Sequence, residues 1–240
     1  MVEEVPEIDF YSALKELKGK GYVKSRRKGD TGIGKTLETE LGIKENNLKI
    51  NDLRHGELIV ELKGQRTKTT SNITLFTLEP NKNGTTDKGL IEKYGYLDVK
   101  GRRGLKITMK TGVYNPQGFT LVVDKKSKRI ILRHRKDGDV CFWDVKSIRD
   151  KLKKKLANNL LIVFADSKKV KEKEHFHFNR AYLLSNLSAM KFLKQVEAGK
   201  IVAEFRMHIK ENGSARNHGT GFRMNERYIA DLYEKKDTVL

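Results

Sequence analysis

The sequence predicts a mixed fold of the α/β or α+β class that forms one unit. Stretches with the alternating or continuous apolar pattern of strands are interspersed with helix-like stretches along the 240 residues. They do not follow the strict strand–helix–strand succession of a doubly wound fold. No internal repeat and no linker of low complexity divides the chain. We therefore treat residues 1–240 as a single unit, which can have two lobes.

The first half of the chain contains short elements bounded by Gly or Pro. In residues 10–17 the helical period places Phe10, Leu14 and Leu17 on one side of a helix. Residues 57–63 have the β-branched and apolar content of a strand, with Gly56 at the preceding turn. The other predicted elements here are helices at 37–41 and 90–94 and strands at 73–77 and 105–109.

The second half begins with a predicted antiparallel meander. Its three strands, at 119–123, 129–132 and 140–143, are separated by turns rich in Lys, Ser and Gly. The further predicted elements are an amphipathic helix at 145–156, strands at 160–165, 175–179 and 201–209, helices at 187–197 and 227–233, and a polar loop at 210–221.

The composition favours a polyanionic partner. The chain carries 50 Lys and Arg against 31 Asp and Glu, a net charge of +19. Neutralised phosphates release counterions, so such a charge favours nucleic acid over an anionic membrane or an inert basic surface. The single cysteine, Cys141, excludes an internal disulfide and fits a reducing compartment. Residues 1–8 lack an apolar signal region, and no run approaches the roughly 18 apolar residues of a membrane span. We expect a soluble, intracellular protein.

A nucleotide-binding motif is one functional alternative. GDTGIGKT at 29–36 matches the phosphate-binding loop pattern GxxxxGK[ST], and LLIVFAD at 160–166 has the form of an apolar strand that ends in a Mg²⁺-binding acid. The context disfavours this alternative. A phosphate-binding loop follows a buried parallel strand, whereas the preceding residues 24–28 read KSRRK. The helix predicted after Thr36 is also short and carries Glu38 in its first turn.

Residues 52–63 contain the strongest candidate for a catalytic site. Glu61 and Lys63 lie two residues apart, so on a strand they point to the same face. Leu58, Val60 and Leu62 then point the other way, into a core. Asp52, just before the strand, can fold back towards Glu61. Two carboxylates suit Mg²⁺, which can activate water and stabilise charge on a phosphodiester. The alternative is the solvated face of an edge strand.

Five stretches in order carry a resemblance to a known family. The whole similarity spans about residues 12–233, and the stretches are GIGKTLE at 32–38, Asp52 with ELK at 61–63, NITLF at 72–76, FHFNRAY at 176–182 and HGTGFR at 218–223. Together they resemble the MvaI/BcnI family of type II restriction endonucleases, relatives of the mismatch-repair nicking enzyme MutH among the PD-(D/E)XK nucleases.

The resemblance implies an α/β fold with a PD-(D/E)XK core, in which helices flank a mixed central sheet and two lobes surround a DNA cleft. It implies a catalytic part at about 10–165 and a DNA-recognition part at about 166–240. The implied activity is Mg²⁺-dependent cleavage of double-stranded DNA, with Mn²⁺ able to substitute. Family members cut short C/G-rich pseudo-symmetric sites such as CCWGG and CCSGG as monomers that nick one strand and then the other. A cognate DNA methyltransferase is the implied functional partner, and the prokaryotic cytoplasm the implied location.

The resemblance also implies catalytic roles. Asp52 and Glu61 match the metal-binding carboxylates, with Leu62 as a further metal position, and Lys63 matches the lysine that orients the attacking water or stabilises the phosphate. Glu38 matches an acid that approaches the site from a helix, and the glycines before it would serve close packing. The gap between Asp52 and Glu61 is longer than in the family, with residues 54–57 as an insertion. Glu57 is therefore an alternative to Asp52.

The residues expected to contact DNA lie in three places. Arginine and histidine can bind base edges, and the resemblance points to the late strand and loop. Their alternatives are a phosphate contact for Arg216 and a salt bridge for Arg206. In relatives that accept S at the central base of the recognition site, histidines match Thr77 and Gly221. The absence of histidine at these two positions favours W or N at the central base. The nominated residues are Arg206, Arg216, His218 and Arg223 for bases, Arg66, Lys68 and Thr69 for the backbone or a groove, and Thr77.

Two further interpretations compete with the restriction enzyme. One is a MutH-like repair enzyme that nicks one strand after activation by a partner, and the other is a binding module that has lost catalysis. His175 and His177 have the spacing of a metal pair on a strand, but no third ligand accompanies them, so packing or phosphate contact is favoured.

Overall fold

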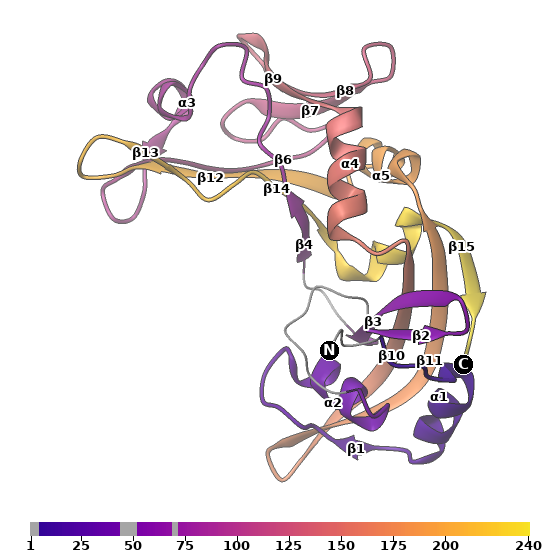
Figure 1. Cartoon of the computed structure of the whole chain (residues 1–240). Coiled ribbons are helices and arrows are strands. Elements are labelled where there is room, and N and C mark those ends of the chain that lie inside the picture. The colour runs from indigo at the N-terminus through magenta and orange to yellow at the C-terminus, as the bar shows by residue number, and fades with distance from the viewer. Residues whose placement is uncertain (1–4, 44–51, 69–71) are drawn as a thin grey trace. The chain divides into compact units, whose positions relative to one another are not determined.

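Strands from distant parts of the chain assemble into two units (Figure 1). The structure is a computed structural model that describes residues 5–43, 52–68 and 72–240. Unit 1 comprises Met1–Thr70, Ala157–Leu187 and Tyr233–Leu240, and unit 2 comprises Ser71–Leu156 and Ser188–Leu232. The limits of these two units thus do not coincide with the expected boundary near residue 165 between a catalytic and a DNA-recognition part. That the whole chain acts as one nuclease unit stays a prediction.

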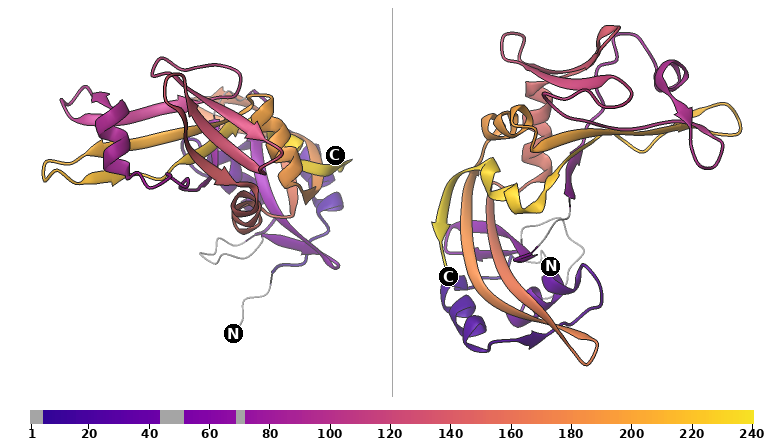
Figure 2. Two further views of the ribbon diagram at one scale, coloured as in Figure 1. Left: turned by 90° about the horizontal axis from the view of Figure 1, so that it is seen from above. Right: turned by 180° about the vertical axis from the view of Figure 1, so that it is seen from behind.

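Unit 1 is built on a mixed sheet with the strand order β1-β11-β10-β3-β2, and β15 pairs with β11. Strands β3 and β10 are parallel, with Leu160 beside Glu61, and the other pairs are antiparallel. The long β10–β11 pair can be followed in the right view of Figure 2. The strands are β1 (Val23–Lys24), β2 (Leu53–His55), β3 (Leu58–Arg66), β10 (Asn159–Val170), β11 (Lys173–Leu187) and β15 (Tyr233–Thr238).

Two helices complete the core of unit 1, namely α1 (Phe10–Gly19) and α2 (Gly32–Glu40). Phe10, Leu14 and Leu17 of α1 are buried, as their helical spacing predicts. They form one cluster with Ile33 and Leu37 of α2 and with apolar side chains of β3, β10 and β11. Helix α1 begins after Asp9, whose carboxylate accepts the backbone N–H groups of Tyr11 and Ser12.

Unit 2 contains a second sheet and the predicted meander. The sheet has the order β4-β14-β12-β6-β5, with β13 on β12, and the meander is β7-β8-β9. The strands are β4 (Asn72–Thr77), β5 (Tyr96–Leu97), β6 (Arg103–Met109), β7 (Phe119–Asp124), β8 (Arg129–His134), β9 (Gly138–Asp144), β12 (Ile201–Ile209), β13 (Ala215–Asn217) and β14 (Gly221–Asn225). The helices are α3 (Asp87–Tyr94), α4 (Val145–Lys155), α5 (Ala189–Glu197) and the 3-10 helix η1 (Glu226–Leu232).

Several predicted boundaries were wrong. Helix α2 starts at Gly32 rather than at residue 37, and α5 starts at Ala189 because Ser188 caps it by accepting the N–H of Lys191. The expected helix at 227–233 is a 3-10 helix, and the loop at 210–221 contains β13. The short or charged strands β1, β2, β5, β14 and β15 were not predicted. In the described part of the chain, no helix is long and apolar enough to cross a membrane.

Candidate active site

A hairpin brings Asp52 to β3, the strand of the candidate residues Glu61 and Lys63. Strands β2 and β3 pair antiparallel, with Leu53 opposite Val60 and His55 opposite Leu58. Gly56 forms the turn with φ +59°, a conformation that favours glycine. Residues 54–57, which were expected to be an insertion, therefore lie at the turn end of a hairpin. Glu57, the alternative to Asp52, is exposed at that turn.

Asp52 folds back onto β3, as the sequence suggested. Its Oδ2 accepts the backbone N–H of Leu62 at 2.7 Å. Burial raises the pKa of the Asp52 carboxyl, although this hydrogen bond favours the charged form and opposes the shift. The carboxylate is thus held beside the middle of β3, where it is partly shielded from water.

Glu61 and Lys63 share one face of β3, and the pKa of Glu61 depends on the charges of both Asp52 and Lys63. Burial, and after it the negative charge of Asp52, raises the pKa of Glu61 to about 7, while the ammonium of Lys63 opposes this rise. Val60 points to the opposite side and is fully buried in the core. Two carboxylates and one ammonium therefore interact around β3.

The Asp52–Glu61 pair fits a divalent cation. Burial disfavours ionisation of both carboxyls, and the charge of Asp52 adds to this effect at Glu61, so a cation between them would relieve it. Among the residues that the structure describes, no group of three or more His, Cys, Asp or Glu side chains gathers as a metal site. A pair of carboxylates suits Mg²⁺, which usually keeps several waters. The role of Leu62 as a metal ligand stays a prediction.

The phosphate-binding motif is not a loop in this structure. Its second half, from Gly32, lies in α2, and the backbone N–H groups of Gly32 and Lys35 donate to the carbonyls of Gly29 and Thr31 at 3.0 and 3.1 Å. The Thr36 hydroxyl is buried, donates to the Gly32 carbonyl at 2.7 Å and accepts the N–H of Arg26 at 2.9 Å. The strand before it, β1, is a two-residue partner of β11. The geometry of a nucleotide site is therefore missing from residues 29–36.

Close packing explains one of the motif's glycines and one glycine of β3. A side chain on Gly32 would collide with the carbonyl of Arg27, and one on Gly64 would press on Ile33 at 3.3 Å. Gly34 has open space around its Cα, so packing does not account for it. Glu38 lies on α2 with its carboxylate 3.8 Å from the Lys35 ammonium. Its participation in catalysis stays a prediction.

Of the three DNA contacts expected after β3, the structure describes two. Arg66 donates from Nε and Nη2 to both carboxylate oxygens of Glu174, each at 2.8 Å, and its guanidinium lies over the Phe176 ring. Lys68 is exposed, and Thr69 lies outside the described residues. The ion pair and the ring contact of Arg66 thus join β3 to β11 within unit 1. A contact of Arg66 with DNA stays a prediction.

Three of the nominated base contacts gather around the end of β12. The side chain of Arg206 directs Nη2 at the carbonyls of His218 and Gly219, each at 3.5 Å, and its Nε is buried without a hydrogen-bond partner. His218 is exposed and stacks on His208 with ring centroids 5.8 Å apart. Arg216 is exposed opposite His208 in the β12–β13 pair.

Arg223 and Thr77 lie on neighbouring strands of the same sheet. Arg223 donates from Nη1 to both carboxylate oxygens of Glu204, at 2.8 and 3.0 Å. The salt bridge that was expected to compete at Arg206 is therefore found at Arg223. Thr77 is the Cα partner of Gly221 in the β4–β14 pair. The two positions considered for the central base are direct neighbours.

His175 and His177 make separate contacts. The Nδ1 of His175 lies 3.1 Å from the carbonyl of Lys173, and the ring of His177 packs against Tyr22. Their pattern on the strand is compatible with packing.

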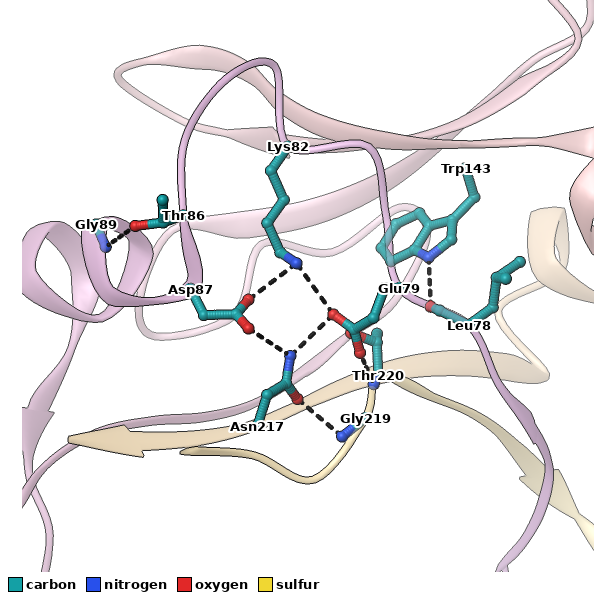
Figure 3. Close-up of polar contacts among 10 residues, drawn as sticks. All are labelled: Leu78, Glu79, Lys82, Thr86, Asp87, Gly89, Trp143, Asn217, Gly219 and Thr220. Carbon is teal, nitrogen blue, oxygen red and sulfur yellow. Dashed lines mark hydrogen bonds and ion pairs between the residues drawn. The ribbon is translucent and has the colours of Figure 1, made fainter. Parts of the chain in front are cut away.

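Sequence analysis missed a cluster of polar residues in unit 2. Glu79, Lys82, Asp87 and Asn217 are joined by hydrogen bonds and ion pairs (Figure 3). They come from three separate segments and follow no motif. Only the position of Asn217 next to His218 could have drawn attention to it.

Known proteins resemble this chain over nearly its whole length. A model of the MvaI/BcnI restriction endonuclease family matches residues 11–233. The restriction endonuclease MvaI in complex with its cognate DNA substrate shares 26% identity, covers 96% of this chain and 97% of its own, and has a TM-score of 0.65. MvaI in the absence of DNA shares 26% identity, covers 96% of each chain and has a TM-score of 0.66. No curated protein sequence matches.

These similarities confirm the predicted restriction-endonuclease-like α/β fold. The chain is a type II site-specific DNA endonuclease and belongs to the MvaI/BcnI restriction endonuclease family.

Proposed function

We propose that this endonuclease uses Mg²⁺, or Mn²⁺ in its place, to cut double-stranded DNA at a short C/G-rich pseudo-symmetric site of the CCNGG type, such as CCWGG. It acts as a monomer that nicks one strand and then the other. In the prokaryotic cytoplasm its functional partner is a cognate DNA methyltransferase. The observation that carries the catalytic proposal is the interaction of Asp52, Glu61 and Lys63 around β3.

The residues of β3 divide the chemistry between them. Asp52 and Glu61 would hold the cation, and the bond from Leu62 fixes the Asp52 carboxylate for this role. When bound, the cation would supply Lewis-acid stabilisation of charge on the phosphate. Lys63 orients the attacking water or donates to a phosphate oxygen. The net charge of +19 gives sequence-independent attraction to the DNA backbone.

A digest of supercoiled plasmid tests the proposal. With Mg²⁺ we expect open circles to appear before linear molecules, because a monomer with one site cuts the strands in succession. Sequencing the ends should place every cut at one CCNGG-type sequence. EDTA should stop the reaction, and Mn²⁺ should restore it. Persistent open circles without linear product would instead indicate a MutH-like nicking enzyme, and an intact plasmid with a salt-sensitive gel shift would indicate a binding module.

The central base offers a sharper test of specificity. Thr77 and Gly221 are paired neighbours that lack the histidine side chains expected for S. We expect kcat/KM on a CCAGG duplex to exceed that on a CCCGG duplex by about tenfold or more, a difference typical of a lost hydrogen bond at a readout position. Equal rates on both duplexes would indicate N at the centre, and a preference for CCCGG would refute this assignment.

A further inference from the structure

Four polar side chains meet beside the Asn217–Thr220 turn (Figure 3). Glu79 follows β4, Lys82 lies in the next loop, Asp87 is in the first turn of α3, and Asn217 ends β13. The Lys82 ammonium lies 3.1 Å from Glu79 Oε2 and 2.9 Å from Asp87 Oδ1. All four residues belong to unit 2. We call them the turn-support network.

Asn217 is the centre of the turn-support network. Its Nδ2 donates to Glu79 Oε2 at 2.8 Å and to Asp87 Oδ2 at 3.1 Å, and its Oδ1 accepts the backbone N–H of Gly219 at 2.8 Å. A primary amide offers two donors and an acceptor on one short side chain. Aspartate at this position would lose both donors and add a third negative charge beside two carboxylates.

Glu79 fixes the other end of the same turn. Its Oε1 accepts the backbone N–H of Thr220 at 2.8 Å and lies 3.3 Å from the Thr220 hydroxyl, while Thr220 is fully buried. Gly219, the residue before Thr220, has φ +84°, which favours glycine. A Cβ at Gly219 would press on the Thr77 side chain at 3.2 Å. Asn217 from within the turn and Glu79 from outside it therefore hold the N–H groups of Gly219 and Thr220.

Lys82 keeps the two carboxylates together. Burial lowers the pKa of Lys82, but hydrogen bonds to Asp87 and Glu79 outweigh that effect and raise it overall. The ammonium therefore stays charged at neutral pH. Asp87 also benefits from its place in the first turn of α3, where the helix dipole favours an anion.

The Asn217–Thr220 turn positions two candidate base contacts, His218 and Arg206. The exposed ring of His218 projects from it, and the carbonyls of His218 and Gly219 face the Arg206 guanidinium. The backbone N–H of His218 donates to the Arg206 carbonyl at 3.2 Å. A displaced turn would therefore change the positions of both side chains. Contacts that are fixed before binding cost less ordering entropy in the complex.

We propose that the turn-support network, Glu79, Lys82, Asp87 and Asn217, consists of positioning residues for DNA sequence discrimination. These residues hold the Asn217–Thr220 turn, which carries His218 and faces the Arg206 guanidinium. The inference rests on the proposed function, since it takes Arg206 and His218 as base contacts. It adds four side chains that act on specificity through the backbone of the turn.

Asn217→Ala tests the proposal in the full-length protein. We expect kcat/KM on the cognate duplex to fall on the order of tenfold, mainly through KM, and the ratio of cognate to one-base-changed cleavage to fall by a similar factor. Binding of non-cognate DNA should stay unchanged, because phosphate contacts dominate it. Amide exchange at Gly219 and Thr220 should become faster. Asn217→Asp should lower discrimination at least as far. Asn212→Ala should keep it, because Asn212 lies on the same β12–β13 hairpin and its Oδ1 accepts from Ser214.

The outcomes separate this inference from the proposed function. If the wild type cuts selectively and Asn217→Ala discriminates equally well, the turn-support network has no role in specificity. A uniform loss of cognate and non-cognate cleavage, together with a lower melting temperature, would show a purely structural role and also refute the inference. If the wild type neither cuts nor selects among duplexes, both the proposed function and the inference are wrong.

Discussion

Replacing Lys63 with alanine is expected to slow DNA cleavage on the order of 10²–10³-fold, the typical loss when one preorganised donor to transition-state charge is removed. The Lys63 ammonium is the positive group that acts on Glu61 in this cluster. Without it, less positive charge faces the phosphate as negative charge develops. Single-turnover cleavage of a cognate duplex with Mg²⁺ measures the loss. A gel shift with Ca²⁺ in place of Mg²⁺ should show nearly unchanged DNA binding.

Lys35→Ala is the matched comparison because Lys35 is the lysine of the rival nucleotide motif. It lies on α2 beside Glu38. We expect this variant to cut DNA at close to the wild-type rate, with at most weaker binding. Loss of ATP or GTP turnover in Lys35→Ala, with normal turnover in Lys63→Ala, would establish the opposite assignment and contradict the role of β3.

The second large effect concerns stability. We expect Glu61→Gln to be inactive yet more stable than the wild type above pH 7 when no metal is present. Burial and the charge of Asp52 raise the pKa of Glu61 from an ordinary 4.5 to about 7 in the folded protein. Between these values the folded state binds a proton that the unfolded state releases. The stabilisation is fully present below pH 4.5 and is lost as the pH rises through about 7.

Unfolding in urea with EDTA at several pH values measures this effect. A tenfold displacement of a protonation equilibrium corresponds to about 1.4 kcal/mol. Because Glu61 is partly solvated, we expect the wild type to lose on the order of 1–2 kcal/mol relative to Glu61→Gln between pH 5 and 8. Mg²⁺ at pH 8 should then stabilise the wild type more than the variant, since binding to the folded state adds RT ln(1 + [L]/Kd). Parallel pH profiles for the two proteins would contradict the clustering of the carboxylates.

Periodicity in the sequence predicted the elements that have a clear amphipathic or apolar pattern. Phe10, Leu14 and Leu17 identify α1, and the alternation around Glu61 identifies the inward and outward faces of β3. Strand β15, with the sequence YEKKDT, has no such pattern because it is an edge strand with an exposed surface. The predicted start of α2 was too late because glycine disfavours helices. In the structure Gly32 is nevertheless helical, and its close approach to the Arg27 carbonyl requires a residue without a side chain.

The candidate active site and the turn-support network differ in how far local sequence reveals them. Asp52 and Glu61 are close in the chain, and a single hairpin joins them, so their spacing carried the prediction. Glu79 and Asn217 lie 138 positions apart, and their partnership depends on tertiary structure. The salt bridge of Arg223 with Glu204 also depends on strand pairing, which placed it on a different arginine from the one expected.

The order in which unit 1 is synthesised has a consequence for the cell. Strand β3, with its two neighbouring acids, leaves the ribosome long before β10, the strand that lies beside Glu61. A nascent or prematurely terminated chain that ends before Asn159 contains Asp52, Glu61 and Lys63 but lacks one flank of their strand. Closing so long a loop is slow compared with local contacts. We therefore expect cleavage activity to appear only after β10 has been translated, and a chain that ends before Asn159 to lack it.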